Sequence, residues 1–237
     1  MKKFSLPKNL IYFLIHAAGW VPGLIILFRV WTDQLTADPI QALTLQTGTN
    51  ALILLMASLS MTPLKNLFGW SWTMTARKWF GVYAFMYAAI HLWIYVGLDY
   101  GFAWAFLFPE FFQKAYLWVG AAAFLILLVM ASTSFRWWMD RLGRGWTYLH
   151  RLVYGAGVLV ILHFAWVRKG DLFALQGDVL EPLLYGVFFL LLMVLRIPLI
   201  RNKLSLWKKT HRKGNTAGSK PVIIRRMRQS GEEVRGE

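Results

Sequence analysis

Residues 147–166 read TYLHRLVYGAGVLVILHFAW, and this stretch decides the class of fold. It is mostly apolar, and about 20 apolar residues in a helix suffice to cross the ~30 Å hydrocarbon core of a bilayer. Two histidines, His150 and His163, lie 13 residues apart within it. Ionisable side chains are costly inside a membrane, so each histidine is a candidate for a functional role.

The rest of the chain has the same apolar character. Its 237 residues are 57% hydrophobic and 16% charged, whereas a soluble domain has about 25% charged residues. The mean hydropathy is +0.47. We therefore predict an all-α integral membrane protein, a bundle of six transmembrane helices over residues 10–30, 44–62, 79–98, 115–133, 149–167 and 179–199.

Positive charge gathers on one side of the predicted bundle. The net charge is +15, and Lys and Arg concentrate in residues 2–8, 65–78 and 136–151 and in the tail after 200. The positive-inside rule then places both termini in the cytoplasm. Because the basic residues follow membrane topology, we expect membrane lipid rather than nucleic acid as their partner.

The composition divides the chain into three parts. Residues 1–9 form a cytoplasmic N-terminus, residues 10–200 form the six-helix domain, and residues 201–237 form a basic tail. The tail is polar with few apolar residues, so we predict that it is disordered in the cytoplasm.

The chain contains no cysteine. Thiolate metal sites, iron–sulfur clusters and disulfides are therefore excluded. A redox-active metal in this protein would need histidine, methionine or oxygen ligands.

His91 and His163 fall at matching depths in two predicted spans that run in the same direction. Each lies about 12 to 14 residues, or ~18–21 Å, from the cytoplasmic start of its span. Two imidazoles at one depth on different helices can hold a flat cofactor between them, and a haem with two histidine ligands is the natural occupant. Hydrogen-bonded packing of both rings is the alternative.

His150 lies about 20 Å nearer the cytoplasm than His163, and Arg77 is its counterpart in depth on the other span. This half-pair is a candidate site for a second haem or a flavin at the inner face. The alternatives are an interfacial histidine bonded to loop groups and an arginine that only follows the positive-inside rule.

Three other residues are secondary candidates. Arg168 and Lys169 follow His163 by five and six residues and are suited to contact haem propionates or a partner protein. Simple solvation at the membrane edge is the alternative for both. His16, in the first predicted span, has either a packing role or a contact with a quinone or cofactor.

Several blocks of the sequence together resemble a known family. They are IHAAGWVPG (15–23), TADPIQALTLQTGTNAL (36–52), MTPLKNL (61–67), RKWFGVYAFMYAAIHLWIY (77–95), LVMASTSFRWWMDRLGRGWTYLHRLVY (128–154) and ILHFAWVRKGD (161–171). Between residues 10 and 200 the chain resembles the MsrQ (YedZ) family of haem-binding membrane subunits, part of the ferric-reductase-like transmembrane group.

This resemblance implies a function and its cofactors. It implies b-type haem, one or two per chain, with His91 and His163 as axial ligands and His150 in the same histidine set, and it implies FMN. The domain of residues 10–200 would then be a haem-binding domain in the inner membrane of a bacterium. Electrons would pass from a quinone pool or a cytoplasmic flavin reductase to a periplasmic, molybdopterin-containing methionine-sulfoxide reductase subunit that repairs oxidised proteins.

The expected role is therefore that of an electron-transfer subunit of an oxidoreductase rather than the catalytic subunit. Two alternatives stay open at this point. One is a stand-alone ferric or quinone reductase of the same superfamily. The other is a haem-free, proton-coupled transporter that uses its histidines as a relay, although no carboxylate lies in the interior of the predicted spans for such a relay.

Overall fold

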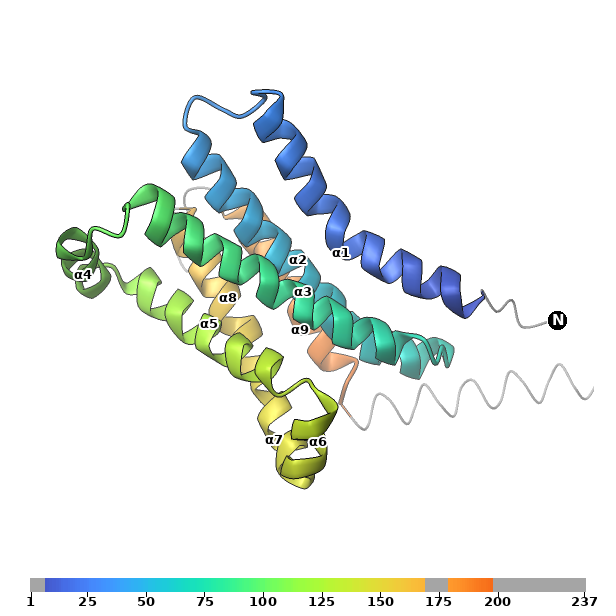
Figure 1. The fold of residues 1–237 in the computed structure, drawn as a ribbon. Helices are drawn as coiled ribbons and strands as arrows, with labels where there is room; N and C mark the ends of the chain where they lie inside the picture. Colours follow the sequence, from blue (N-terminus) through green and yellow to red (C-terminus); the bar gives the residue numbers. More distant parts are fainter. Residues whose placement is uncertain (1–6, 169–178, 198–237) are drawn as a thin grey trace, which may run out of the picture. The chain divides into compact units, whose positions relative to one another are not determined.

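A computed structural model describes residues 7–168 and 179–197, and every regular element in these ranges is helical (Figure 1). Lys169, the other residues of 169–178 and the predicted tail lie outside the described residues. The elements are α1 (Lys8–Trp31), α2 (Pro39–Phe68), α3 (Thr73–Trp93), a π-helix η1 (Ile94–Asp99), α4 (Trp104–Gln113), α5 (Ala115–Ser132), α6 (Arg136–Leu142), α7 (Arg144–Leu149), a 3-10 turn η2 (His150–Leu152), α8 (Val153–Val167) and α9 (Leu180–Val194).

Five helical stretches are long and apolar enough to cross a membrane, namely Lys8–Trp31, Pro39–Phe68, Thr73–Asp99, Ala115–Ser132 and Arg144–Val167. They coincide with the first five predicted spans. The sixth, α9, is apolar but has only 15 residues, or about 22 Å of helix. The structure thus shows a multi-pass helical membrane protein with five candidate spans and one shorter apolar helix.

Local signals make α2 longer than the predicted span 44–62. The side chain of Asp38 accepts a hydrogen bond of 2.9 Å from the backbone N–H of Gln41, and Pro39 occupies the first helical position. Both features start helices. Gly69 ends the helix with φ 72°, a left-handed conformation that favours glycine.

The predicted span 149–167 is interrupted near its start. A single turn of 3-10 helix at His150–Leu152 separates α7 from α8. The helix after His91 also changes, because η1 continues α3 as a π-helix over Ile94–Asp99. Departures from α-helical geometry of this kind often lie near functional sites.

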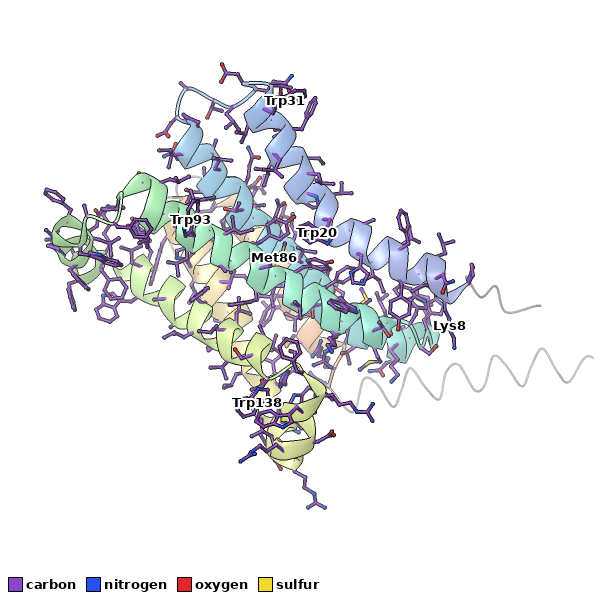
Figure 2. The ribbon with its side chains drawn as sticks, in the orientation of Figure 1. Lys8, Trp20, Trp31, Met86, Trp93 and Trp138 are labelled. Carbon is purple, nitrogen blue, oxygen red and sulfur yellow. The ribbon has the colours of Figure 1, made fainter. Side chains whose placement is uncertain are left out.

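Two helix pairs form the frame of the bundle. α2 packs along α3, α5 packs along α8, and α3 contacts α5 so that the pairs meet. The core between them contains the fully buried side chains of Leu52, Leu55, Leu59 and Tyr87. Most other large apolar side chains point outward (Figure 2), as expected for a protein that faces lipid.

The short helices lie at opposite ends of the bundle. Figure 1 shows α4 at the end where α1 leads into α2, and α6 and α7 at the end where α2 leads into α3. Both ends are rich in exposed tryptophan, such as Trp31 at 83% and Trp137 at 59%. Tryptophan is typical of the two membrane–water interfaces.

Candidate functional site

His91 of α3 and His163 of α8 lie next to each other inside the bundle, with their rings edge-on. Their ring centres are 6.2 Å apart and their planes are inclined at 88°. The Nδ1 atom of His91 lies 2.8 Å from the carbonyl oxygen of Thr44 on α2, and that of His163 lies 2.9 Å from the carbonyl oxygen of Tyr116 on α5. A carbonyl oxygen only accepts, so both Nδ1 atoms carry the proton and each Nε2 keeps a lone pair.

The spacing of the two rings fits one metal ion between them. A metal–nitrogen bond of about 2.0–2.1 Å, with ~1.1 Å more from nitrogen to ring centre, places two opposed imidazoles about 6.2 Å apart. The described residues contain no cluster of three or more His, Cys, Asp or Glu side chains that could hold a metal alone. Two histidines suffice for haem iron, because the macrocycle supplies the other ligands.

Each histidine ring rests against a glycine. A Cβ added to Gly48 would lie 3.1 Å from Nδ1 of His91, and one added to Gly120 would lie 2.7 Å from Nδ1 of His163. Both values are below ordinary contact distances, so a larger residue at either position would press on the ring. The glycine surface and the carbonyl together fix the orientation of each imidazole.

The two half-sites repeat one pattern. Each histidine follows the residue whose carbonyl oxygen accepts its Nδ1–H by 47 positions. It follows the glycine that contacts its ring by 43 positions. Sequence reasoning found the histidines and missed Thr44, Gly48, Tyr116 and Gly120. The equal spacings were available in the sequence, but threonine and tyrosine act here through their backbones, so residue types give no hint of the match.

A cavity of about 270 Å³ lies between α2, α3, α5 and α8 toward the α6–α7 end, and it brings His150 and Arg77 together. The His150 ring stacks on Trp146 with centres 4.0 Å apart, and its Nδ1 lies 3.2 Å from the Trp146 carbonyl oxygen. Its Nε2 is buried without a hydrogen-bond partner among the described residues. A group bound in the cavity could supply one.

The same cavity is positively charged. Arg77 and Lys78 are the charged residues among the described residues that line it, and Arg77 donates to the hydroxyl of Thr62 at 3.3 Å. Arg196, just after α9, lies close enough for its charge to act on Arg77. Sequence reasoning gave Arg196 no role, although it falls within the predicted sixth span, 179–199.

Arg196 is anchored by three contacts. It donates to the hydroxyl of Tyr154 at 2.6 Å and to the carbonyl oxygen of Leu59 at 2.5 Å, and its guanidinium lies over the Tyr154 ring. Ile197 precedes a proline, a position that disfavours helix. These features account for the end of α9 at Val194, five residues before the predicted end of the sixth span.

The secondary candidates lie away from the histidine pair. Nδ1 of His16 lies 2.8 Å from the hydroxyl of Tyr83, and its ring packs edge-on against Trp79, so it takes part in the contact between α1 and α3. Arg168 forms an ion pair with Glu181 at the start of α9. Lys169 lies outside the described residues.

Comparison with known proteins identifies the family of this chain. Residues 44–161 match the family described as ferric reductase like transmembrane component. The chain is 37% identical over 210 residues to the protein-methionine-sulfoxide reductase heme-binding subunit MsrQ of Xanthomonas axonopodis pv. citri, which covers 86% of this chain and 89% of the relative.

A second relative gives the same result. The protein of the same name from Rhodospirillum rubrum is 41% identical over 173 residues, which covers 72% of this chain and 80% of the relative. The resemblance noted in the sequence blocks is therefore confirmed. The chain belongs to the MsrQ family of ferric-reductase-like membrane proteins.

Proposed function

We propose that this protein is the haem-binding, electron-carrying membrane subunit of a methionine-sulfoxide reductase system. The observation that carries the proposal is the spacing of His91 and His163, which suits two axial ligands of one iron. A b-type haem bound there would supply one-electron redox chemistry. With both axial positions filled by histidine, the site suits electron transfer rather than binding of a substrate at the iron.

The chain's own residues would set the properties of that site. The carbonyl groups of Thr44 and Tyr116 hold both Nδ1 protons and so direct both Nε2 atoms to the metal. A hydrogen bond to the far nitrogen also makes an imidazole a stronger electron donor to its metal. The glycines restrict how far the rings can turn.

The cavity at His150 and Arg77 is the proposed site for a cofactor at the inner face. Its cationic lining favours an anionic group, such as the propionates of a second haem or the phosphate of FMN. The buried Nε2 of His150 would contact the same cofactor. The proposal of FMN as a cofactor rests on the family resemblance.

The proposed topology keeps six spans, with α9 contributing to the sixth and both termini in the cytoplasm of a bacterium, across its inner membrane. α9 supports this, because Leu184, Val187 and Leu190 expose their side chains on its surface as the other spans do. The basic residues of α6 and α7 support a cytoplasmic location for that end.

The proposed partners lie on opposite sides of the membrane. A quinone pool or a cytoplasmic flavin reductase would donate electrons. A soluble periplasmic subunit with molybdopterin would accept them at the α4 end and reduce methionine sulfoxide. Arg168 and Lys169 would contact that subunit or the haem propionates. His16 would either pack between α1 and α3 or contact a quinone.

A visible spectrum of the purified full-length protein tests the proposal. We expect a Soret band, and His91→Ala and His163→Ala should each remove it or convert the haem to high spin. His16→Ala is the matched control and should keep the band, because that ring is bonded to Tyr83. An unchanged band in both ligand variants would refute the assignment. Iron and flavin contents per chain would give the cofactor stoichiometry.

A stand-alone ferric or quinone reductase is the second candidate, favoured by the match over residues 44–161. Reduction of a ferric chelate or a quinone by the reduced protein, at a rate equal to that of transfer to the periplasmic subunit, would support it. A complete absence of haem would instead favour the proton-coupled transporter.

A further inference from the structure

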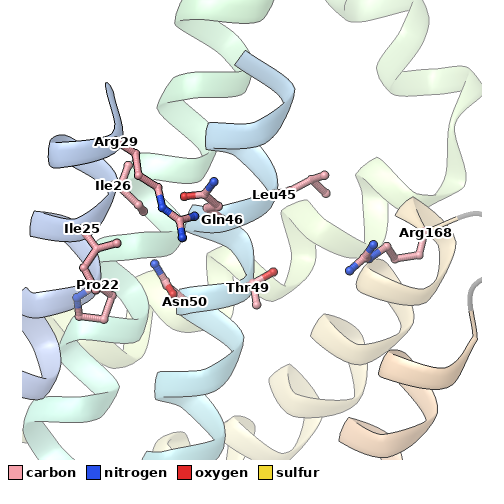
Figure 3. A pocket seen from close by; sticks show the side chains of 9 residues that line it. All are labelled: Pro22, Ile25, Ile26, Arg29, Leu45, Gln46, Thr49, Asn50 and Arg168. Atoms are coloured by element: carbon pink, nitrogen blue, oxygen red, sulfur yellow. The ribbon is translucent and has the colours of Figure 1, made fainter. Parts of the chain in front are cut away.

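A second cavity, of about 470 Å³, lies at the other end of the bundle, and the proposed redox sites do not account for it. It opens between α1 and α2, with Arg168 at its margin (Figure 3). Its walls are apolar on α1 and largely polar on α2, with the lining residues Pro22, Ile25, Ile26, Arg29, Leu45, Gln46, Thr49 and Asn50. We call it the α1–α2 groove.

Three polar side chains in the groove have no partner among the residues that the structure describes. Arg29, Gln46 and Asn50 make no hydrogen bond or ion pair with any described residue, whereas Arg168 is paired with Glu181. Figure 3 shows the Arg29 guanidinium next to the amide of Gln46, with Asn50 one turn further along α2. Unpaired polar groups beside hydrocarbon are costly, so a bound molecule that pairs with them would be stabilised.

The depth of these groups matches the parts of a phospholipid. α2 has 30 residues, or about 45 Å, so each end extends about 7 Å beyond a ~30 Å hydrocarbon core. Gln46 is then about 3 Å inside the core and Asn50 about 9 Å inside. Arg29, in the last turn of α1, lies at the level of the headgroups. From the end of the bundle inward, the groove presents a cation and then two amides, with apolar side chains of α1 beside the amides.

The charges select the kind of headgroup. Arg29 and Arg168 are the charged residues among the described residues that line the groove, and no carboxylate there could hold an ammonium group. A guanidinium pairs strongly with phosphate, and the amides of Gln46 and Asn50 can donate to ester or glycerol oxygens. An uncharged headgroup would leave Arg29 unpaired.

We infer that the α1–α2 groove binds one anionic phospholipid, with its phosphate on Arg29 and its glycerol backbone on Gln46 and Asn50. The bound lipid covers the face of α2 opposite to the one that holds His91. Gln46 and Asn50 each follow a residue that contacts His91, Thr44 or Gly48, by two positions, or about 200° of helix rotation. The lipid therefore braces the helix that orients one histidine. This site is independent of the proposed redox function.

Native mass spectrometry of the full chain, delipidated in detergent and titrated with phosphatidylglycerol or phosphatidylethanolamine, tests the inference. We expect one tightly bound phosphatidylglycerol and a rise in Tm. Arg29→Gln should weaken its binding about 10- to 100-fold, the range expected for loss of a charge-assisted hydrogen bond. Arg136→Gln, on the opposite end of the bundle, is the matched control and should bind like the wild type.

A second variant distinguishes loss of lipid binding from misfolding of Arg29→Gln. Asn50→Leu removes a donor to the lipid and introduces no charge, so it should also weaken binding while the Tm without lipid stays near that of the wild type. Equal binding by Arg29→Gln and Arg136→Gln would overturn the inference, as would equal affinity for phosphatidylethanolamine. An equal rise in Tm with inorganic phosphate alone would show a free-anion site and overturn the lipid assignment.

Discussion

Gly120→Ala is the sharpest test of how the histidine pair is held. The added Cβ would lie 2.7 Å from Nδ1 of His163 and 2.8 Å from its Cε1 atom. Ordinary contacts begin near 3.4 Å, so the ring has to move by roughly 0.7 Å or more away from α5. That movement stretches the 2.9 Å hydrogen bond to the carbonyl oxygen of Tyr116, which then no longer has good geometry.

The expected effect is a change in redox potential. A weakened hydrogen bond at Nδ1 makes the imidazole a poorer donor, which destabilises ferric iron relative to ferrous iron. A hydrogen bond contributes about 0.5–1.5 kcal/mol, which for a one-electron couple corresponds to about 20–65 mV. We therefore expect the midpoint potential to rise by this amount, with a 10- to 100-fold loss of haem affinity as the upper bound.

The assay is a spectroscopic redox titration of the purified variant, with Gly155→Ala as the matched control. Gly155 lies on α8 with His163, and an added Cβ there meets nothing within 4 Å. Both substitutions gain about 1 kcal/mol of helix propensity, so only the contact with the ring distinguishes them. Equal midpoint potentials and haem contents in the two variants would refute the positioning role of Gly120.

Four further outcomes follow from the same structure. Gly48→Ala places a Cβ 3.1 Å from the other ring, so its redox titration should show a smaller upward shift, and a larger one would contradict the reasoning. Arg77→Gln should lower flavin or second-haem content per chain while the spectrum of the outer haem is retained. Arg196→Met leaves a buried carbonyl and phenol unpaired, so unfolding should become easier by about 2–4 kcal/mol, seen as a lower Tm. Gly157→Ala brings a Cβ within 2.5 Å of the Phe189 ring, and overpacking of about 1–3 kcal/mol should outweigh its helix gain, so an unchanged Tm would be the contrary result.

The helical class and the matched depth of the two histidines can be predicted by counting residues along the sequence. Apolar length identifies the spans, and a rise of 1.5 Å per residue places His91 and His163 at one depth. Their alignment across the bundle depends on how α3 and α8 pack, which is a tertiary property. The Thr44 and Tyr116 carbonyls are invisible to residue-type reasoning, because every residue has one.

The start of α2 differs from the predicted span, and the sequence contains a signal for it that hydropathy does not include. The start of α2 at Pro39 follows from Asp38 as a cap and proline at the first helical position. The break at His150–Leu152 has no such signal in the sequence. Arg196 had no assigned role in the sequence, and only the folded bundle brings it to Tyr154 and Leu59.

The repeated half-site also bears on the order of assembly. α2 with α3, and α5 with α8, each make a hairpin-like unit that already contains one histidine, its carbonyl and its glycine. The units touch less extensively than the helices within each of them. Metal captured between them acts as a non-covalent cross-link, and at 100 times its Kd a ligand adds about 2.7 kcal/mol to stability. If haem binds between His91 and His163 as proposed, its insertion would join the two helix pairs, and its loss would remove that link while each pair keeps its own packing.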